Sequence, residues 1–175
     1  IIIQNGDLEK KFKAEKVFDN YYNNKAEEER KEAEAKAAAE KIQKEKIAAL
    51  ITEKVNNFNS QKATATTTPS GLMYKITQKG SGAKPAAGTT VYFHYSGFFE
   101  DGNLFDSNYE DVNKTYGKFD ANRAAQGGYQ AFPFQAGKKD GMIPGFLEGL
   151  NLMNLGVKAI VFIPSNLAYG ERGAG

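Results

Sequence analysis

The sequence predicts an α+β protein in which an antiparallel β-sheet is wrapped on a short α-helix, with a long α-helix on the N-terminal side. Two features of the residue pattern along the chain support this prediction. Residues 16–60 contain neither glycine nor proline and are dominated by strong helix formers. After Gly71 the chain changes to short apolar runs separated by turn residues, with one amphipathic helix at residues 143–153. Several strands with a single helix are typical of an antiparallel sheet packed on that helix.

The composition leaves little scope for metal or thiol chemistry. The 175 residues suffice for one domain with additional material, and 41% hydrophobic and 25% charged residues are ordinary values. The net charge of +2 is too small to predict a nucleic-acid partner. There is no cysteine and only one histidine, His94, which excludes disulfides, thiol catalysis and multi-histidine metal sites. No apolar run approaches the roughly 18 residues of a membrane span, and we expect no cofactor.

The first residues differ from the helix that follows them. Residues 1–3 are a β-branched run that predicts a strand, and Asn5-Gly6 is a typical turn signal. The chain starts without methionine, so we expect it to be part of a longer reading frame. In that frame residues 1–15 would be the tail of a preceding domain.

Residues 16–60 are expected to form one charged helix. Pairs at i,i+4 spacing with the acid first each contribute about 0.2–0.5 kcal/mol. They are Glu27–Lys31, Glu32–Lys36 and Glu40–Lys44. Large apolar residues at helical spacing form a stripe only near the end of the helix, and these are Ile47, Leu50, Ile51, Val55 and Phe58. The pattern favours a solvated spacer whose last turns dock on a neighbouring domain. The alternative is a dimerising coiled coil, but residues 27–41 do not sustain heptads with large apolar residues.

A linker and a second domain follow the helix. Residues 61–70 are a threonine-rich linker, and residues 71–175 form the second domain. Strands are expected at residues 72–77, 90–99 and 103–107, and at the start of residues 156–170. Residues 108–130 show no clear periodicity and are expected to be irregular.

Strand alternation places Phe93 and Tyr95 on one face, toward the short helix, and His94 on the other. We therefore expect His94 to be a surface residue. The domain has more large aromatic side chains than a small core readily accommodates, and Phe93 and Phe134 are the expected core members. The remaining rings are candidates to line an apolar cleft with few polar groups, which is the usual form of a small-ligand site.

Several spaced motifs of this domain match a known family. The segments "VYFHYSG", "EDGNLFDS", "PGFLEGLNLMNLGVKAIVFIP" and "LAYGERGAG" resemble the FKBP-type peptidyl-prolyl cis-trans isomerases, the immunophilins that bind macrolides. The segment "SGLMYKITQKGSGAKPAAG" is similar to the first strand and turn of that family. The resemblance covers residues 71–175. It implies an FKBP-like fold, proline-containing polypeptides as substrates, and macrolides as further ligands.

The resemblance also implies two sets of site residues. The catalytic set is Tyr95, Phe105, Asp106 and Tyr169. The substrate-binding set is Phe132, Met142, Ile143, Phe146 and Ala168.

Each implied residue has a role in the family's pocket. Tyr95 and Asp106 are a hydrogen-bonded pair, which makes the carboxylate tolerable in an apolar site. The alternative is that this pair only ties one strand to another. Phe105 and Phe132 are implied as aromatic walls and Phe146 as the floor. Met142 and Ile143 are implied to contact the ligand through their backbone. The Tyr169 hydroxyl is implied to reach a carbonyl of the substrate.

The chain departs from the family pattern in three places. Phe146 stands where many members have tryptophan, so we expect weaker macrolide affinity. Residues 108–130 are longer than the corresponding loop of minimal members, and they could gate the cleft or bind a partner. Their "NKT" at Asn113 fits a glycosylation pattern, but chance is the better explanation. The chain also stops before the last strand of the family, which is implied to supply another aromatic wall.

The function that this resemblance implies is prolyl cis-trans isomerisation that assists protein folding. An aromatic pocket would desolvate and twist the X-Pro bond, without a catalytic base or a covalent intermediate. The alternative is a chaperone or holdase, or a dimeric binding module, with weak isomerase activity.

The N-terminal segment has a resemblance of its own. "IIIQNGDLEKKFKAEKVF" resembles the closing strand and tail of a cyclophilin-type isomerase, which would make the complete protein a fusion of two isomerases. The competing architecture is a helix-dimerised FKBP-type chaperone. From the cyclophilin resemblance alone we expect a cytoplasmic location, with the periplasm as the alternative.

Overall fold

The computed structural model describes the backbone of residues 5–173 and the side chains of residue 13 and residues 15–173. The strand predicted at residues 1–3 lies outside the described residues. The chain divides into two compact units, Ile1–Ala48 and Ala49–Gly175, and one long helix contributes to both. In the described part of the chain, no helix carries an apolar stretch long enough to cross a bilayer.

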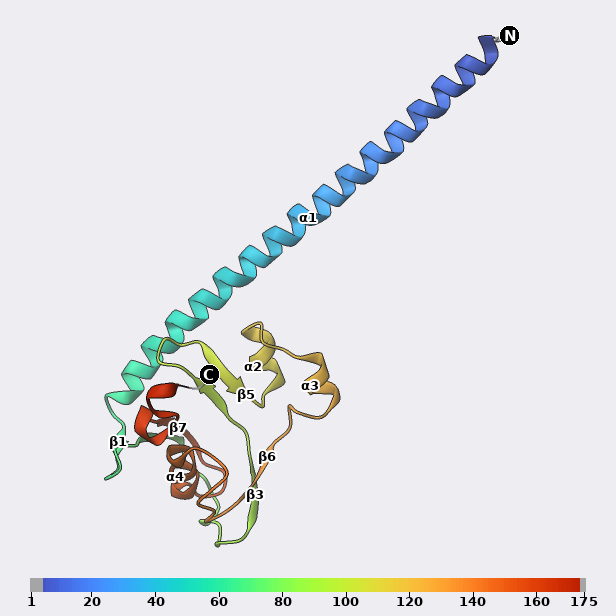
Figure 1. Cartoon of the computed structure of the whole chain (residues 1–175). Helices are drawn as coiled ribbons and strands as arrows, with labels where there is room; N and C mark the ends of the chain where they lie inside the picture. The colour runs from blue at the N-terminus through green and yellow to red at the C-terminus, as the bar shows by residue number, and fades with distance from the viewer. Residues whose placement is uncertain (1–4, 174–175) are drawn as a thin grey trace. The chain divides into compact units, whose positions relative to one another are not determined.

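Helix α1 spans Asn5–Lys62 and is longer at both ends than predicted (Figure 1). The turn predicted at Asn5–Gly6 is wrong, because both residues lie in the helix. The first backbone N–H groups of a helix have no intrahelical partner, and asparagine and glycine are tolerated at such positions. The strong helix formers that follow therefore decide the conformation of this segment.

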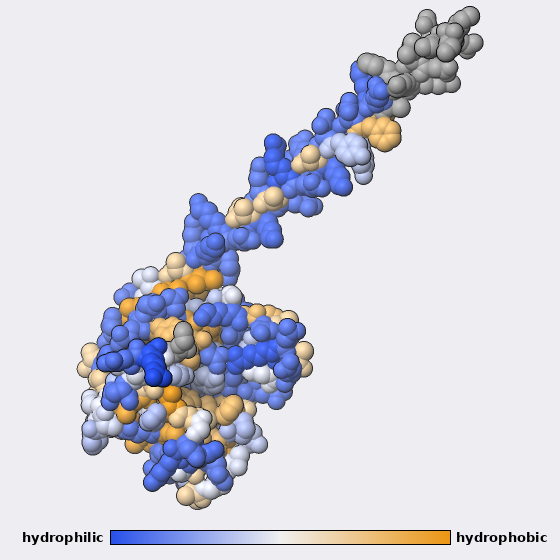
Figure 2. Space-filling view, viewed as in Figure 1, coloured by the Kyte–Doolittle hydropathy of each residue, from blue (hydrophilic) through white to orange (hydrophobic). Residues whose placement is uncertain are grey.

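The part of α1 that belongs to the first unit is exposed at all of its described residues except Ile47, and it is mostly hydrophilic (Figure 2). Its ion pairs join successive turns. Lys31 Nζ lies 2.8 Å from Glu27 Oε1, which confirms one predicted pair, and Arg30 Nε lies 3.6 Å from Glu34 Oε1. Interactions within the helix itself thus support this segment.

The last turns of α1, from Ala49 onward, pack on the second unit, as predicted for the apolar stripe. The Phe58 ring centroid lies 5.6 Å from that of Phe98 and 6.5 Å from that of Phe162. Lys54 Nζ lies 4.9 Å from the Phe98 ring centroid. The division between the two compact units falls inside this helix, between Ala48 and Ala49.

The strands form three small antiparallel sheets where the sequence predicted one. The first sheet has the order β1-β2-β7, and the other two are the pairs β3-β6 and β4-β5. The bounds are β1 Thr66–Thr67, β2 Met73–Gln78, β3 Thr90–Phe93, β4 Ser96–Phe98, β5 Leu104–Ser107, β6 Phe132–Gln135 and β7 Lys158–Phe162.

The strand predicted at residues 90–99 is interrupted at His94 and Tyr95 and becomes β3 and β4. The Asn108 side chain takes over the hydrogen bonds at the interruption. Its Oδ1 accepts the Tyr95 backbone N–H at 2.8 Å, and its Nδ2 donates to the Phe93 carbonyl at 3.2 Å. Asn108 is only 3% exposed, so its side chain supplies hydrogen bonds to backbone groups that water does not reach freely.

The segment predicted to be irregular contains two short helices, α2 (Glu110–Thr115) and α3 (Ala121–Ala125), so that prediction is wrong. Each helix is too short to show a periodic pattern of apolar residues in the sequence. Helix α3 has a clear N-cap, since the Asp120 side chain accepts the backbone N–H groups of Asn122 and Arg123 at 2.8 and 3.1 Å. The predicted amphipathic helix is α4 (Pro144–Leu152).

The core of the second unit lies between its sheets and α4. Its buried apolar members are Leu72, Leu104, Phe134, Ala136 and Leu147. Phe134 is 4% exposed, as predicted for a core residue, and Phe93 is half-buried. After β7 the chain forms two 3-10 turns, η1 (Ser165–Leu167) and η2 (Gly170–Arg172). These turns carry the segment that contains Tyr169.

Candidate active site

Asp106 on β5 is the polar centre of the site. Its Oδ2 accepts a hydrogen bond from the Tyr95 hydroxyl, which the interruption between β3 and β4 directs toward it. Its Oδ1 accepts a hydrogen bond from Arg123 Nη1 at 2.6 Å. The predicted Tyr95–Asp106 pair is therefore present in the structure, and Arg123 extends it to three residues.

The three groups fix one another's protonation states. Burial and the hydrogen bond to Asp106 raise the pKa of Tyr95 to about 12, so its hydroxyl keeps its proton. Partial burial by itself would raise the pKa of Asp106, but the hydrogen bonds from Arg123 and Tyr95 outweigh it and hold that pKa below its ordinary value. The bond to Asp106 in turn raises the pKa of Arg123. At neutral pH the site therefore holds a carboxylate, a guanidinium and a neutral phenol.

Arg123 was missed by sequence reasoning. It lies on α3, 17 positions after Asp106, within the segment expected to be irregular. Its Nε donates to the Gly128 carbonyl at 3.2 Å, and its guanidinium lies 4.9 Å from the Tyr129 ring centroid. The available signal was chemical: a carboxylate in an apolar site requires a cation or several donors. Arg123 is the single arginine of residues 108–130.

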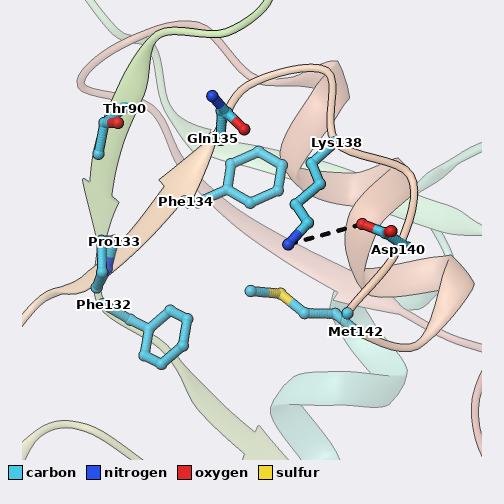
Figure 3. Close-up of a pocket in the computed structure, with 9 residues that line it drawn as sticks. Thr90, Phe132, Pro133, Phe134, Gln135, Lys138, Asp140 and Met142 are labelled. Carbon is cyan, nitrogen blue, oxygen red and sulfur yellow. Dashed lines mark ion pairs between the residues drawn. The ribbon is translucent and has the colours of Figure 1, made fainter.

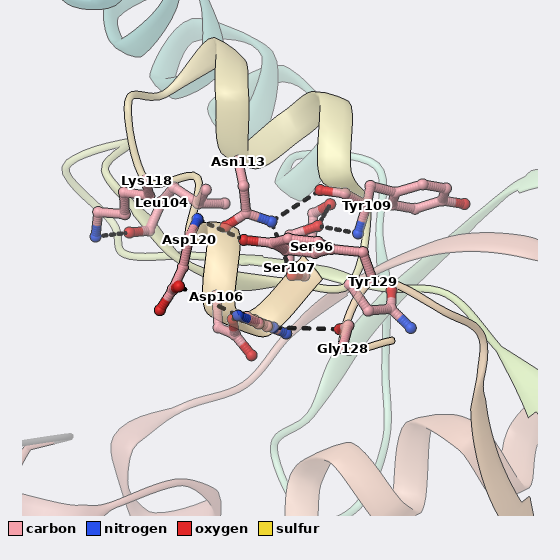
Figure 4. Close-up of polar contacts among 12 residues, drawn as sticks. Ser96, Leu104, Asp106, Ser107, Tyr109, Asn113, Lys118, Asp120, Gly128 and Tyr129 are labelled. Atoms are coloured by element: carbon pink, nitrogen blue, oxygen red, sulfur yellow. Dashed lines mark hydrogen bonds and ion pairs between the residues drawn. The ribbon is translucent and has the colours of Figure 1, made fainter. Parts of the chain in front are cut away.

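The polar contacts of two buried asparagines attach the inserted segment to its surroundings, and Figure 4 shows those of Asn113. Asn113 Nδ2 donates to the backbone carbonyls of Ser107 and Tyr109, both at 2.8 Å. Asn108 Nδ2 also donates to the Gln130 carbonyl at 2.9 Å. Asn113 is only 3% exposed, so its amide is not accessible for glycosylation in this fold, in line with the expectation that the motif arises by chance. The segment that carries Arg123 is thus anchored at both of its ends.

A group of aromatic rings surrounds Tyr95. The Phe146 ring, on α4, lies 5.8 Å from the Tyr95 ring and 5.5 Å from the Phe93 ring, centroid to centroid. The Phe132 ring lies 5.7 Å from the Phe93 ring. Tyr95 and Phe93 both face α4, which confirms the predicted strand alternation. The predicted floor residue Phe146 and wall residue Phe132 thus belong to one connected group of rings.

A second group of rings begins next to Asp106. The Phe105 ring lies 5.8 Å from the Tyr169 ring and 5.3 Å from the Phe99 ring. Phe105 is 38% exposed and Tyr169 is 46% exposed, which is high for large rings in a folded unit. All four predicted catalytic residues are therefore linked, through the Tyr95–Asp106 bond, the adjacency of Asp106 to Phe105 and the Phe105–Tyr169 contact.

The remaining predicted residues lie around this centre in different ways. Ile143 is the N-cap residue of α4, and its carbonyl accepts the backbone N–H of Phe146 at 3.1 Å. Ala168 directly precedes Tyr169 at the end of η1. Met142 and Phe132 line an open hollow of about 460 Å³ whose other walls come from β3, β6 and the loop before α4 (Figure 3). Tyr95, Asp106 and Phe146 do not line this hollow.

His94 lies on the opposite face of the strand and is exposed, as predicted. Its ring stacks on Tyr109 with centroids 4.6 Å apart and 22° between the planes. Among the described residues, no three acidic or histidine side chains are grouped so that they could hold a metal ion.

The site can bind an apolar group between exposed rings and can orient it by hydrogen bonds. Its carboxylate is already bonded to a phenol and to a guanidinium, so it is poorly placed to act as a general base. Tyr169 is 46% exposed, so its side chain can meet a ligand at the edge of the site. The geometry therefore favours a reaction that depends on desolvation and orientation over one that transfers a proton.

Comparison with known proteins identifies relatives of this chain. A family model described as FKBP-type peptidyl-prolyl cis-trans isomerase matches residues 81–175. A Neisseria meningitidis protein named "Probable FKBP-type peptidyl-prolyl cis-trans isomerase FkpA" is 38% identical over 149 residues, 85% of this chain and 46% of that protein. The Escherichia coli "FKBP-type 22 kDa peptidyl-prolyl cis-trans isomerase" is 35% identical over 139 residues, 78% of this chain and 58% of that protein.

A solved structure covers more of the chain at lower identity. The crystal structure of FkpA from Escherichia coli aligns with 99% of this chain and 65% of that chain, at 26% identity and a TM-score of 0.47. This chain spans about half the length of the curated relatives that it matches.

Proposed function

This chain belongs to the family of FKBP-type peptidyl-prolyl cis-trans isomerases, and on that premise we propose that it isomerises X-Pro bonds at the Tyr95–Asp106 site and so assists protein folding. The observation that carries the proposal is the arrangement of Asp106, which is held between Tyr95 and Arg123 beside exposed aromatic rings. Proline-containing polypeptides are the substrate class of the family.

The proposed mechanism lowers the barrier to rotation by differential binding. Resonance imposes a barrier of about 18–20 kcal/mol on rotation of a peptide bond. Twisting breaks the resonance and removes charge from the carbonyl oxygen, so the twisted species is less polar than the planar one. An apolar, ring-lined site favours the twisted species, whereas water favours the planar species, and only such a difference accelerates the reaction.

Each predicted residue has a proposed role in this mechanism. Phe105, Phe132 and Phe146 exclude water from the proline ring and the twisting bond. The Tyr169 hydroxyl donates to a substrate carbonyl, and Met142 and Ile143 contribute a backbone contact to the ligand. Ala168 directly precedes Tyr169 and belongs to the substrate-binding set. Tyr95 and Arg123 are positioning residues, because they act through Asp106.

The test uses a chromogenic tetrapeptide that contains one proline, together with two variants of the site. We expect Asp106→Ala and Phe105→Ala each to lower kcat/KM by about tenfold, which corresponds to about 1.4 kcal/mol of transition-state stabilisation. His94→Ala is the matched control, because His94 lies on the opposite face of the same strand and is exposed. Rates of the two site variants within a factor of two of the wild type would contradict the assigned site.

Macrolide binding is a further part of the proposal. It is supported by the family membership and by the connected rings of Phe93, Phe132 and Phe146. Because Phe146 stands where many relatives have tryptophan, the affinity should rise in Phe146→Trp. Calorimetric titration of both proteins with a macrolide measures the two affinities. Equal affinities would contradict the assignment of Phe146 to the pocket floor.

We also propose that α1 carries an association surface for a second copy of the chain. Val17, Phe18, Tyr21 and Tyr22 recur at helical spacing, and each is between 61% and 67% exposed. Exposed apolar groups that share a face commonly mark protein interaction sites. Light scattering should show a larger mass for the wild type than for Phe18→Glu, with Ile42→Glu as the control on the same helix. Equal masses for all three proteins would reject this surface.

The competing function, a holdase or binding module with weak isomerase activity, is favoured by the same exposed residues of α1. An aggregation assay with Asp106→Ala separates the two functions. If suppression of aggregation survives the loss of isomerisation, binding is the primary activity. If both fall together, the isomerase is the primary activity.

The upstream architecture remains a proposal with two forms. A stretch of 149 matched residues leaves at most 26 of the 175 residues outside it, so the likeness to the Neisseria protein reaches into α1 at least as far as residue 27. This extent supports a helical module that accompanies the isomerase domain over a cyclophilin fusion. The cytoplasmic location rested on the cyclophilin resemblance and stays a prediction. The upstream reading frame decides both questions.

A further inference from the structure

Strand β6 (Phe132–Gln135) has one free edge. In the described part of the chain it pairs with β3 alone, in an antiparallel register that sets Phe134 opposite Val91 and Phe132 opposite Phe93. Phe132, Pro133 and Gln135 are exposed. An edge strand with unpaired backbone groups is a template for another extended chain.

The hydrogen bonds of β6 define which of its groups face the free edge. The Ala136 N–H donates to the Thr89 carbonyl at 2.9 Å, so Ala136 faces β3. In an antiparallel ladder the residues that face the partner alternate, which turns Phe134 toward β3 and turns Pro133 and Gln135 away from it. A proline is accepted at such a position, because its missing N–H would have faced solvent. The free edge therefore presents the Pro133 carbonyl and the Gln135 N–H.

This pair of groups is suited to a parallel strand. In parallel pairing, one residue of the added chain donates its N–H to a carbonyl of the edge strand. The carbonyl of that same residue accepts the edge-strand N–H that lies two residues further on. Pro133 and Gln135 supply that acceptor and that donor. An antiparallel partner would require an N–H from Pro133 or the carbonyl of Gln135, and that carbonyl already accepts the Lys138 N–H at 3.1 Å.

The hollow of about 460 Å³ lies beside this edge (Figure 3). The side chains of Phe132, Met142 and Lys138 point toward the same open space. Lys138 Nζ lies 3.6 Å from Asp140 Oδ1, so a charge pair borders the hollow. Phe132 and Met142 also belong to the predicted substrate-binding set, and the Phe132 ring contacts Phe93, which in turn contacts Phe146, so the hollow and the proposed proline site share a wall.

We propose that residues flanking the isomerised proline bind as an added parallel strand on the free edge of β6, with their side chains in the hollow. The ligand is an extended segment of the same polypeptide substrate, recognised by its backbone and by an apolar side chain between Phe132 and Met142. This proposal rests on the proposed isomerase function and extends it to a subsite that only longer substrates reach. Main-chain hydrogen bonds to a sheet edge are an established mode of peptide recognition.

The test measures how much the enzyme gains from substrate length. We compare kcat/KM for an eight-residue and a four-residue peptide with the same central X-Pro bond, and we expect a ratio of about tenfold in the wild type, from two backbone hydrogen bonds. Gln135→Pro removes the edge N–H without removing a bond to β3 and should lower that ratio about fivefold. Gln135→Ala keeps the N–H and should retain most of the gain.

A second measurement does not depend on a variant that folds. In the eight-residue peptide, one amide at a time is replaced by an ester, and the wild-type enzyme is assayed with each peptide. The ester that replaces the N–H bonded to the Pro133 carbonyl should remove most of the gain in kcat/KM that the longer peptide provides, and esters at the other positions should not. The Gln135 N–H should also become protected from hydrogen exchange when the all-amide peptide is bound.

The outcomes separate this proposal from the proposed function. A wild-type length ratio near one, equal ratios for Gln135→Pro and Gln135→Ala, or esters that all act alike would overturn the added strand. An enzyme that does not isomerise the four-residue peptide contradicts the proposed function instead. In that case, protection of the Gln135 N–H by the long peptide supports the edge site, and its absence rejects it.

Discussion

The two parts of helix α1 are stabilised by different interactions, although they belong to one continuous element. Up to Ala48 the described side chains are mostly exposed, including those of Val17, Phe18, Tyr21 and Tyr22, and ion pairs link successive turns. From Ala49 onward a stripe of large apolar residues packs on the strands of the second unit. The first part follows from local helix propensity, whereas the second is held by residues far away in the sequence.

The ion pairs of the two units show the same contrast. The Lys31–Glu27 pair at 2.8 Å has side chains that are 67% and 53% exposed. The Arg123–Asp106 pair at 2.6 Å has side chains that are 33% and 32% exposed. The two pairs have similar N–O distances but differ in solvent exposure. Their contributions to the free energy of unfolding should therefore depend on exposure and on additional hydrogen bonds more than on distance.

Phe58→Ala should give the largest loss of stability. Removing a ring that packs on Phe98 and Phe162 should lower the free energy of unfolding of the second unit by about 3 kcal/mol. Ile42→Ala is the matched change on the same helix, where Ile42 is 53% exposed, and it should cost less than about 0.5 kcal/mol. Urea unfolding followed by near-ultraviolet circular dichroism measures both. Equal losses would mean that the two parts of α1 do not differ.

Gly102→Ala should be nearly as destabilising. Gly102 has a φ of +82°, and an added Cβ would lie 2.7 Å from the Ile51 carbonyl oxygen and 2.9 Å from Val55 Cγ2, both on α1. We expect a loss of about 2–3 kcal/mol from strain and overpacking. Gly88 has a similar φ of +85° but open space around it, so Gly88→Ala should cost only about 1 kcal/mol. The difference in unfolding midpoint between the two variants reports the contact with α1, and no difference would argue against that contact.

Arg123→Gln should raise the pKa of Asp106 and destabilise the fold by about 1 kcal/mol, a value limited by the partial exposure of the pair. The folded-state pKa of Asp106 is lowered, so the carboxylate stabilises the fold above its unfolded pKa of about 3.9, and this contribution is lost as pH falls through the folded value. Without Arg123 the loss should begin at higher pH. Carbon NMR titration of the Asp106 carboxyl measures the shift, and an unchanged midpoint would show that Tyr95 alone suffices.

Glu27→Gln should have the smallest effect. Removing an exposed i,i+4 pair on an otherwise strong helix should cost about 0.3 kcal/mol, and added salt should abolish the difference. Helicity at 222 nm during thermal unfolding at low and high salt provides the measurement. A loss above 1 kcal/mol would show that this pair contributes more than local helix stabilisation.

Sequence reasoning predicted the segments of β2, β3, β4, β5 and β7 and the short helix α4, because their apolar residues recur at periods that the local backbone dictates, but it did not predict β1 or β6. It also predicted which face of the strand carries Phe93 and Tyr95. It did not predict the interruption between β3 and β4 or the helices α2 and α3. These features depend on side chains such as Asn108 and Asn113, which hydrogen-bond to backbone groups that are distant in sequence or hidden from solvent.

The candidate site shows the same limit at single residues. The Tyr95–Asp106 pair could be predicted from motifs, because both residues lie within recognisable segments. Arg123 could not, because the length of the inserted segment carries no information about where its arginine lies in space. The free edge of β6 was also invisible in the sequence, since an edge exists only once the neighbours of a strand are known.

The sequence by itself determined the long helix, most of the strand segments and the residues of the proposed proline site, because helix propensity, apolar periodicity and spaced motifs act over short stretches of chain. Only the tertiary structure decided where the helix stops being self-supporting, which cation neutralises Asp106 and which strand edge stays open. Those features arise when distant segments meet, and the free energy of such contacts depends on burial and geometry that no local pattern encodes.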